Sequence, residues 1–337
     1  MLAGMKAVAR LALAAGLAAL SAAALAADKV SFGTNWVAQA EHGGYYQALA
    51  DGTYAKYGLD VTIVPGGPQA NNRLLMTVGK IDFYMGGPFQ AFAAVEQNIP
   101  TVQIAAIFQK DPQALIAHRG QGVETFADLK TLPTLFISKP GQATFYQWMK
   151  ARFGFSDAQV KPYTFNAQPF IVDKKSAMQG YVTSEPYSIE RATQEKPLVF
   201  LLADQGYAPY STTIETRVAL TREKPDLVQR FVDATIIGWA NYLYGDNAAA
   251  NALIRKENPE MTDERIAYSV AMMKEYGVVD SGDALKLGIG AMTEERVKRF
   301  YDEMVAAGVL KPGLDWRKAI DLRFVNKGVG AELRPRN

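Results

Sequence analysis

Cysteine is absent from the 337-residue chain, and histidine is nearly so, since only His42 and His118 occur. Without cysteine the chain forms no disulfide, no thiolate metal site, no cysteine nucleophile and no lipid-modified N-terminal cysteine. Two histidines nearly rule out a histidine-based transition-metal site, so we expect neither a metal nor a cofactor. The sequence also lacks a Gly-x-Ser-x-Gly elbow and a phosphate-binding loop, so no catalytic set emerges.

Charge is scarce near the N-terminus, where Lys6 and Arg10 are the only charged residues before Asp28. An apolar stretch follows Arg10 and ends in Ala24-Leu25-Ala26, a small-x-small cleavage pattern. The stretch is shorter than the ~20 residues that usually span a membrane. These features predict a secretory signal peptide over residues 1–26. An exported chain without a lipid anchor fits the periplasm of a Gram-negative cell best.

The formal net charge is +2 and includes Lys6 and Arg10, so removal of the signal leaves 2 − 2 = 0. A neutral mature chain has no electrostatic footprint for nucleic acid or for an anionic membrane. Hydrophobic residues make up 49% of the sequence, which is enough for a large core. The length suggests about two domains.

From Val30 onward, short β-branched strands alternate with helices, which predicts an α/β protein with mostly parallel sheets. Gly-Gly-Pro follows a strand twice, at residues 66–68 and 86–88, and we expect a helix after each, the first running through Val78. In the second α/β run we expect strands at 161–165 and 180–183, with a helix at 170–179. The last third has mainly helical periodicity.

Two polar, Pro-containing stretches, near residues 110–112 and 205–210, are typical of crossings between two α/β units. They predict two α/β lobes joined by a two-strand hinge. Lobe one comprises residues 28–109 plus 211–337, and lobe two comprises residues 110–210. Two such lobes can close around a ligand. Ligands of open α/β sheets bind beyond the carboxyl ends of the strands.

Four loops that follow strands hold the candidate ligand-binding residues. Aromatic rings in them can stack on a flat ligand, amides and a carboxylate can fix its orientation, and a glycine before a helix lets it approach the backbone. We expect Trp36 with Tyr45 or Tyr146 to stack, and Gln39, Gln90 and Glu185 to form hydrogen bonds. The full set is Asn35, Trp36, Gln39, His42, Tyr45, Gly87, Pro88, Gln90, Gln142, Tyr146, Tyr181 and Glu185.

Structural roles compete with these binding roles. Trp36 and Tyr45 are equally suited to a core, and His42 to a helix cap. Glu185 precedes Pro186 and can simply cap the helix that begins there. If His42 belongs to the site, it contacts the ligand or orients Tyr45.

Several segments resemble one family of binding proteins. They are Asn35-Trp36, His42-Gly43-Gly44-Tyr45, Tyr57-Gly58-Leu59-Asp60-Val61 and Gly79-Lys80-Ile81-Asp82. The chain resembles the substrate-binding proteins of nitrate/sulfonate/taurine-type ABC importers, and is most similar to their thiamine-pyrimidine-precursor branch. That branch shows Asp-Trp-x-Pro-Asn-Thr-Asn-His in its first loop; this chain keeps Trp36 and His42 of the pattern and has Gln39 and Glu41 in place of the two Asn.

The resemblance implies a type II periplasmic-binding-protein fold, with the ligand cleft between the two lobes. It also implies an ABC importer membrane permease and its ATPase as partners, and a monomeric binding component. A pyrimidine-synthesising enzyme of the same superfamily depends on a cysteine-rich stretch, which this chain lacks, so we expect no enzymatic activity.

The ligand expected from these features is a small, flat nitrogen heterocycle, similar to a thiamine pyrimidine precursor. A small anion, such as taurine, an alkanesulfonate, nitrate or an aromatic acid, is a second candidate and would be held at helix N-termini near Pro68 and Pro88. Lys139 and Arg73 are the cations available for it. The sequence is also compatible with a periplasmic enzyme that uses Glu41 and His42, and with a sensor that feeds a membrane receptor.

Overall fold

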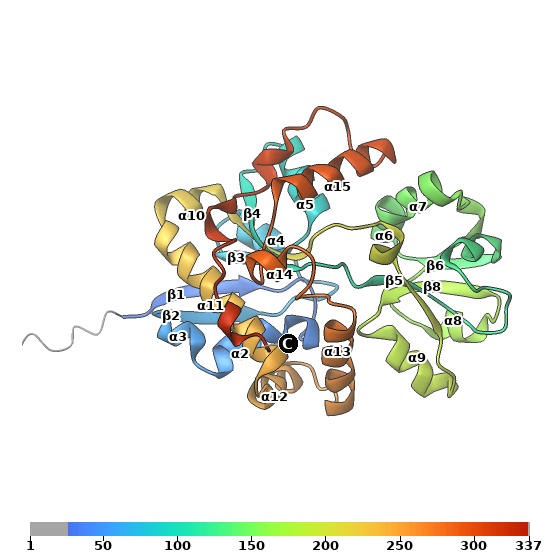
Figure 1. Cartoon of the computed structure of the whole chain (residues 1–337), viewed down its shortest axis with the longest axis horizontal. Coiled ribbons are helices and arrows are strands. Elements are labelled where there is room, and N and C mark those ends of the chain that lie inside the picture. Colours follow the sequence, from blue (N-terminus) through green and yellow to red (C-terminus); the bar gives the residue numbers. More distant parts are fainter. Residues whose placement is uncertain (1–25, 336–337) are drawn as a thin grey trace, which may run out of the picture.

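The computed structural model describes residues 26–335, so the predicted signal peptide, except Ala26, lies outside the described residues. Two α/β lobes lie side by side, lobe one at the left of Figure 1 and lobe two at the right. No helix within the described residues is both long and apolar enough to cross a membrane.

Lobe one is built on a five-stranded sheet with the order β2-β1-β3-β10-β4. Its neighbours pair in parallel except around β10, which runs antiparallel to both β3 and β4. Its strands are β1 (Asp28–Gly33), β2 (Leu59–Val64), β3 (Phe83–Gly86), β4 (Thr101–Phe108) and β10 (Ser211–Arg217). β10 comes from the far side of lobe two in the sequence, so lobe one is formed by both ends of the described chain.

Lobe one also contains ten helices among the described residues. They are α2 (Gly43–Ala50), α3 (Thr53–Lys56), α4 (Asn72–Thr77), α5 (Pro88–Glu96), α10 (Val218–Glu223), α11 (Pro225–Tyr244), α12 (Ala248–Glu257), α13 (Asp263–Glu275), α14 (Ala284–Leu287) and α15 (Glu294–Ala306), with short 3₁₀ turns η1 (Ala40–His42), η5 (Trp316–Ala319) and η6 (Leu322–Phe324). The apolar face of α11 packs on the sheet, where Phe231 stacks on Phe83 at a centroid distance of 4.1 Å. A Cβ on Gly44 of α2 would lie 2.2 Å from the Trp239 ring of α11, so glycine there allows close helix packing.

Lobe two repeats the plan on a smaller scale. Its sheet has the order β7-β6-β8-β5-β9, with β5 antiparallel to β8 and β9. The elements are β5 (Gln113–Ala117), β6 (Thr134–Ile137), β7 (Val160–Pro162), β8 (Ser176–Tyr181), β9 (Leu198–Leu201), α6 (Lys139–Ala143), α7 (Phe145–Phe153), α8 (Gln168–Val172) and α9 (Glu185–Thr193).

The strand directions define one edge of each sheet that faces the other lobe. The chain crosses from the carboxyl end of β4 to the amino end of β5, and returns from the end of β9 to the start of β10. The carboxyl ends of β1, β3, β6 and β8 therefore lie at the same edges as the crossings, because these strands run parallel to β4 or β9. We call these two facing edges the interlobe edge.

Arg296 of α15 holds the two crossings together. Its guanidinium donates to the carbonyl oxygens of Ala208 and Pro209, each at 3.3 Å, and to that of Gln109. It also lies over the Tyr210 ring, with 4.2 Å between the guanidinium carbon and the ring centroid. The Arg296 side chain thus connects both crossings to lobe one by hydrogen bonds.

Three predicted elements were wrong in detail. The strand expected at 161–165 ends at Pro162, which lacks the N–H needed to continue the ladder. Residues 176–179 lie in strand β8 rather than in a helix, since a short buried apolar run fits either state. The first Gly-Gly-Pro opens no helix; α4 begins at Asn72, after Asn71 caps it by accepting from Leu74 N at 3.2 Å.

Candidate functional site

The loop after β1 brings Asn35 and Trp36 to the interlobe edge. Hydrogen bonds fix its backbone: Thr34 Oγ1 donates to Trp36 O at 2.7 Å, and Gly66 N donates to the same carbonyl at 3.0 Å. A Cβ on Gly66 would lie 2.4 Å from Thr34 O, so the loop fits only against glycine. Gly66 of the first Gly-Gly-Pro therefore allows its loop to pack closely against the backbone of the Trp36 loop.

Trp36 differs from the other three tryptophans of the chain. Trp148, Trp239 and Trp316 are 2%, 0% and 6% exposed, whereas Trp36 is half-buried. Its ring lies 5.2 Å, centroid to centroid, from that of Phe165, which belongs to lobe two. An aromatic face of lobe one is thus presented to the opposite lobe.

Lobe two contributes a carboxylate at the first residue of α9, Glu185. Glu185 is half-buried, and its Oε2 accepts from Tyr181 N at 2.7 Å. Burial raises the pKa of Glu185, and hydrogen bonds from the Tyr181 N–H and the Tyr163 hydroxyl, with the charge of Arg265, offset part of that rise. The Glu185 side chain, considered as a helix cap, thus accepts a hydrogen bond from the backbone of Tyr181, the last residue of β8.

A second carboxylate, Glu41 of η1, is 3% exposed and links the lobes directly. Thr183 of lobe two donates its hydroxyl proton to Glu41 Oε1 at 2.5 Å. Burial raises the pKa of Glu41 to about 7, although the bond from Thr183 acts in the other direction. Helix α13, which sits between the lobes in Figure 1, strengthens this contact, since Ser269 Oγ donates to Thr183 O at 2.7 Å.

Carboxylates dominate the charge at the interlobe edge. Burial raises the pKa of Asp111, in the first crossing, to about 6. The pKa of Tyr181 is raised by burial and by the negative charges of Asp111, Glu185 and Glu41, so all three carboxylates act on one side chain. Such an environment favours a ligand that donates hydrogen bonds over one that carries negative charge.

The cations considered for an anionic ligand are placed unfavourably. Arg73 is already paired, since its Nε and Nη2 donate to the two carboxylate oxygens of buried Glu215 at 3.1 and 2.8 Å. Lys139 is exposed at the start of the five-residue helix α6. Arg265 of α13 reaches lobe two, where it donates to Ser184 Oγ at 3.3 Å.

Tyr45 and Tyr146 are buried in the cores of their lobes and do not line the interlobe edge. Both are 0% exposed. The Tyr45 ring stacks on Phe32 at 4.1 Å, and the Tyr146 hydroxyl donates to Ser156 O at 2.7 Å. The core role considered for Tyr45 is the observed one, because protein side chains already cover its ring.

The amide and imidazole candidates differ in their burial and in their hydrogen-bond partners. Gln142 is occupied within lobe two, since its Nε2 donates to Ile137 O at 2.8 Å. Gln90 is exposed on α5, and Gln39 is half-buried before η1. His42 is 1% exposed; neither ring nitrogen has a hydrogen-bond partner within residues 26–335, and burial lowers its pKa to about 3.

The second Gly-Gly-Pro matches its prediction locally. Gly87 is the N-cap of α5 and Pro88 is its first residue, and both are half-buried. A Cβ on Gly87 would meet no atom within 4 Å. Gly87 therefore borders open space at the carboxyl end of β3.

Sequence reasoning missed Phe165 and Thr183. Phe165 was assigned to a strand, although Pro162 was the signal that the strand ends earlier. Thr183 falls at the end of the strand expected at 180–183, whereas β8 ends at Tyr181 and leaves Thr183 in the following turn. Its bond to Glu41 joins residues 142 positions apart, and no local pattern indicates such a contact.

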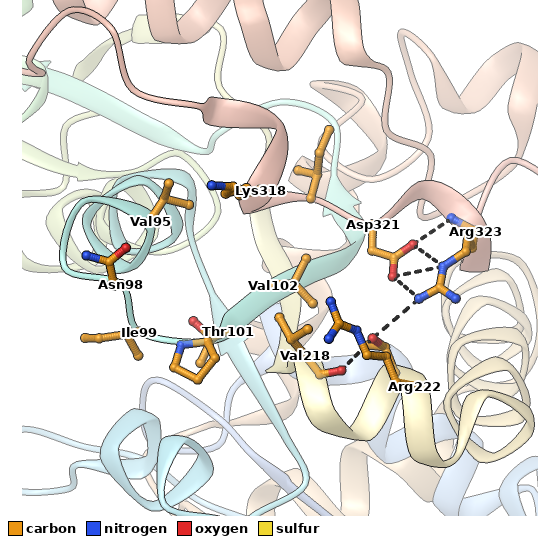
Figure 2. Close-up of a pocket in the computed structure, with 13 residues that line it drawn as sticks. Val95, Asn98, Ile99, Thr101, Val102, Val218, Arg222, Lys318, Asp321 and Arg323 are labelled. Atoms are coloured by element: carbon orange, nitrogen blue, oxygen red, sulfur yellow. Dashed lines mark hydrogen bonds and ion pairs between the residues drawn. The ribbon is translucent and has the colours of Figure 1, made fainter.

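A pocket of about 390 Å³ lies elsewhere on lobe one, shown in Figure 2. It is lined by Thr101 and Val102 at the start of β4 and by Val218 after the end of β10, so it lies at the opposite edge of the sheet. The charge of Arg323 there is neutralised by Asp321, 2.5 Å away. This pocket is therefore separate from the interlobe edge.

No group of three or more His, Asp or Glu residues within the described part of the chain could hold a metal ion. The ligand chemistry of the interlobe edge thus comes from the aromatic ring, the carboxylates and the hydroxyls described above.

Solved structures with this architecture define the fold. The periplasmic aliphatic sulphonate binding protein SsuA from Escherichia coli aligns with a TM-score of 0.66 at 13% identity, covering 87% of this chain and 92% of that one. The alkanesulfonate-binding protein SsuA from Xanthomonas axonopodis pv. citri, bound to MOPS, gives 0.61 at 13% identity, with 87% and 98% covered. The desulfurization enzyme DSZB gives 0.58 at 13% identity, with 88% and 97% covered. The chain has the two-lobed type II periplasmic-binding-protein fold, which confirms the predicted fold class.

Residues 39–250 match the family described as NMT1/THI5 like, and the chain belongs to this family. The riboflavin-binding protein RibY of Chloroflexus aurantiacus is 22% identical over 313 residues, covering 89% of this chain and 87% of RibY. The 4-amino-5-hydroxymethyl-2-methylpyrimidine phosphate synthase of Schizosaccharomyces pombe is 26% identical over 106 residues, covering 32% of this chain and 31% of the synthase. The resemblance noted from the sequence is thereby confirmed.

Proposed function

We propose that this chain is the solute-binding component of an ABC importer and captures a planar nitrogen heterocycle between its lobes. It acts in the periplasm as a monomer and delivers the ligand to a membrane permease whose ATPase supplies the energy. The observation that carries this proposal is the pairing of two features across the interlobe edge. Trp36 presents a half-buried ring, and Glu185 presents a carboxylate that forms no ion pair within residues 26–335.

Each feature selects one property of the ligand. An aromatic ring stacks on a flat ring and contributes about 0.5–1.5 kcal/mol beyond area burial. A carboxylate in a desolvated position accepts hydrogen bonds from N–H groups, and such charge-assisted bonds are the stronger kind. Flavins and aminopyrimidines, which appear in the names of the two curated relatives, combine a flat ring with N–H donors.

A sulfonate or another small anion is the second candidate, because two structural neighbours are named for sulfonates. The charges of this chain favour it less. Arg73 is neutralised by Glu215, and the helix expected at Pro68 begins only at Asn72. An anion would also face the carboxylates of Glu41, Asp111 and Glu185, and like charges raise the cost of burial.

Catalysis by Glu41 and His42 is disfavoured by their contacts. Glu41 accepts from Thr183 instead of His42, and burial lowers the pKa of His42 to about 3. An acid–base pair needs a hydrogen bond between its members or to a shared substrate proton. The structural neighbour DSZB shows that enzymes also use this fold, so turnover of a bound compound would overturn a pure binding role.

Isothermal titration of the mature chain, refolded to remove co-purified ligand, tests the proposal. The first probe set is riboflavin and 4-amino-5-hydroxymethyl-2-methylpyrimidine; the second is taurine, methanesulfonate and nitrate. We expect binding from the first set only. Trp36→Ala should weaken it about tenfold or more, since stacking on an aromatic side chain contributes about 1–3 kcal/mol. Trp36→Phe is the matched control and should retain most of the affinity. Binding of anions alone would overturn the heterocycle proposal.

A further inference from the structure

Trp36 and Phe165 meet ring to ring across the two lobes. Their centroids are 5.2 Å apart and their planes are inclined by 45°. Trp36 follows β1 of lobe one, and Phe165 follows β7 of lobe two, so each ring projects from a strand's carboxyl end. The contact depends on the relative position of the lobes rather than on the packing of either one.

Phe165 has two properties that the packing of lobe two does not require. Its φ of 62° lies in the left-handed region, which bulky residues rarely adopt and which costs about 1–3 kcal/mol. Its side chain is 58% exposed. A large apolar ring held in a strained backbone and left mostly in water contributes little to the stability of its own lobe. Such strain is typical of functional positions.

We propose that Trp36 and Phe165 form an aromatic clamp that closes on both faces of one planar ring system. This inference rests on the proposed function and narrows its ligand class to flat rings that carry no bulky group on either face. In the structure the two rings cover one another. Phe165 is thus a specificity-determining residue of lobe two, opposite Trp36 of lobe one.

The size of the required movement is small. A ring sandwiched between two others needs about 3.5 Å on each side, or about 7 Å between the outer rings. The centroids must therefore separate from the observed 5.2 Å by about 2 Å, and the two planes, now inclined by 45°, must become parallel; rotation of the lobes about the crossings and rotation of the side chains supply these changes. The tetrahedral head of a sulfonate has no flat face and gains nothing from this geometry.

Phe165 is also connected to the carboxylate of the site. Its ring lies 5.4 Å from that of Tyr163, and the Tyr163 hydroxyl lies near enough to Glu185 to help lower the pKa that burial raises. A ring held by the clamp therefore lies on the same side of lobe two as the acceptor for its N–H groups.

The clamp is tested first without ligand, by iodide quenching of tryptophan fluorescence. Trp36 is the one tryptophan of the four that is not buried, so quenching reports mainly on it. Phe165→Ala should raise the quenching constant by roughly twofold, because it uncovers one side of the Trp36 ring. Val172→Ala, which removes an exposed apolar side chain from α8, is the control and should leave quenching unchanged.

Titration with riboflavin and with 4-amino-5-hydroxymethyl-2-methylpyrimidine is the second test. Phe165→Ala should weaken binding about tenfold or more, and Phe165→Tyr should stay within about threefold of the wild type. The melting temperature of Phe165→Ala should not fall, because the side chain is mostly exposed.

Three results would overturn the clamp. Unchanged quenching in Phe165→Ala would show that the rings do not meet in solution. Binding lost in Trp36→Ala but kept in Phe165→Ala would overturn the clamp and leave the proposed function intact. Failure of both probes to bind the wild-type chain would overturn the proposed ligand class together with the clamp.

Discussion

Each lobe packs a glutamate against a strand glycine, and the two glutamates differ in their partners. A Cβ on Gly86 would lie 2.7 Å from Glu215 Oε2 in lobe one, and a Cβ on Gly180 would lie 3.0 Å from Glu185 Cβ in lobe two. Arg73 neutralises Glu215, with 2.8 Å between Nη2 and Oε1. Glu185 has an N–H donor but no ion-pair partner among residues 26–335. The charge of a paired buried carboxylate is compensated within its own lobe, whereas an unpaired carboxylate remains available to a ligand.

The two aromatic residues, Trp36 and Phe165, also differ in how closely their own lobe packs around them. The loop of Trp36 is fixed by backbone hydrogen bonds and by close contact with Gly66. Phe165 lies between exposed Thr164 and Asn166, in a loop with less protein around it. The Trp36 loop is thus packed more closely by its own lobe than the Phe165 loop is.

The largest effect on stability is expected when a substitution removes the ion pair of lobe one. Arg73→Ala should lower the free energy of unfolding by about 3–5 kcal/mol, because it leaves the fully buried Glu215 uncompensated. Urea denaturation measures the change. The double variant Arg73→Ala/Glu215→Gln should recover much of the loss. If Arg73→Ala unfolds at the wild-type urea concentration, the contrast between the two glutamates is wrong.

The corresponding change in lobe two should affect binding rather than stability. Glu185→Gln should weaken binding of 4-amino-5-hydroxymethyl-2-methylpyrimidine about tenfold or more, since a hydrogen bond to a charged group contributes about 1.5–3 kcal/mol. Its stability above neutral pH should not fall, because burial raises the pKa of Glu185 and the substitution removes that buried charge. Glu190→Gln, exposed on the same helix, is the control for titration calorimetry. Wild-type affinity in Glu185→Gln would exclude this carboxylate from the site.

Gly66→Ala tests whether the surface of lobe one is fixed by close packing. The added methyl group overlaps the backbone of the Trp36 loop and should cost about 1–3 kcal/mol in unfolding free energy, with weaker ligand binding. Gly87→Ala is the matched control for the unfolding free energy alone, because its φ of −153° suits any residue and its Cβ would meet open space. Thermal unfolding and titration calorimetry give both readouts. Equal behaviour of the two variants would contradict the close packing.

The last expected effect concerns the bond between the lobes and appears only as a dependence on pH. Burial raises the pKa of Glu41 to about 7 from 4.5, so the folded protein binds more protons than the unfolded chain between these pH values. The stability contributed by this group is fully present below pH 4.5 and is lost as the pH rises through 7. Glu41→Gln keeps an acceptor for Thr183 and removes the titration.

Melting curves at pH 5 and pH 8 check this expectation. The fall in melting temperature between the two should be smaller in Glu41→Gln than in the wild type by roughly 5–10 °C, because the raised pKa corresponds to about 2–3 kcal/mol over this pH range and each kcal/mol to about 2–4 °C. The exposed Glu260→Gln should behave as the wild type does. An unchanged pH dependence in Glu41→Gln would place the titration on another group.

The sequence predicted the architecture well because strand and helix periodicities are local properties. Alternating β-branched runs and helical repeats were enough to indicate two α/β lobes, and the mainly helical last third agrees with α11, α13 and α15. The motifs around Trp36 and Gly58 were enough to indicate the family. Of the predicted loops, the structure brings those that hold Trp36 and Glu185 to the interlobe edge, and their contact with a ligand stays a prediction.

Tertiary structure decided which candidates face the other lobe. Tyr45 and Trp36 lie nine positions apart in similar surroundings, yet one is buried against Phe32 and the other faces lobe two. Arg73 and Glu215 pair across 142 positions of sequence, and so do Glu41 and Thr183. A residue's own neighbours in sequence set its strand or helix, but its partners across the fold depend on how those elements pack. The type and order of the elements were therefore written in the sequence, while the opposition of Trp36 and Phe165 exists only once the two lobes are placed face to face.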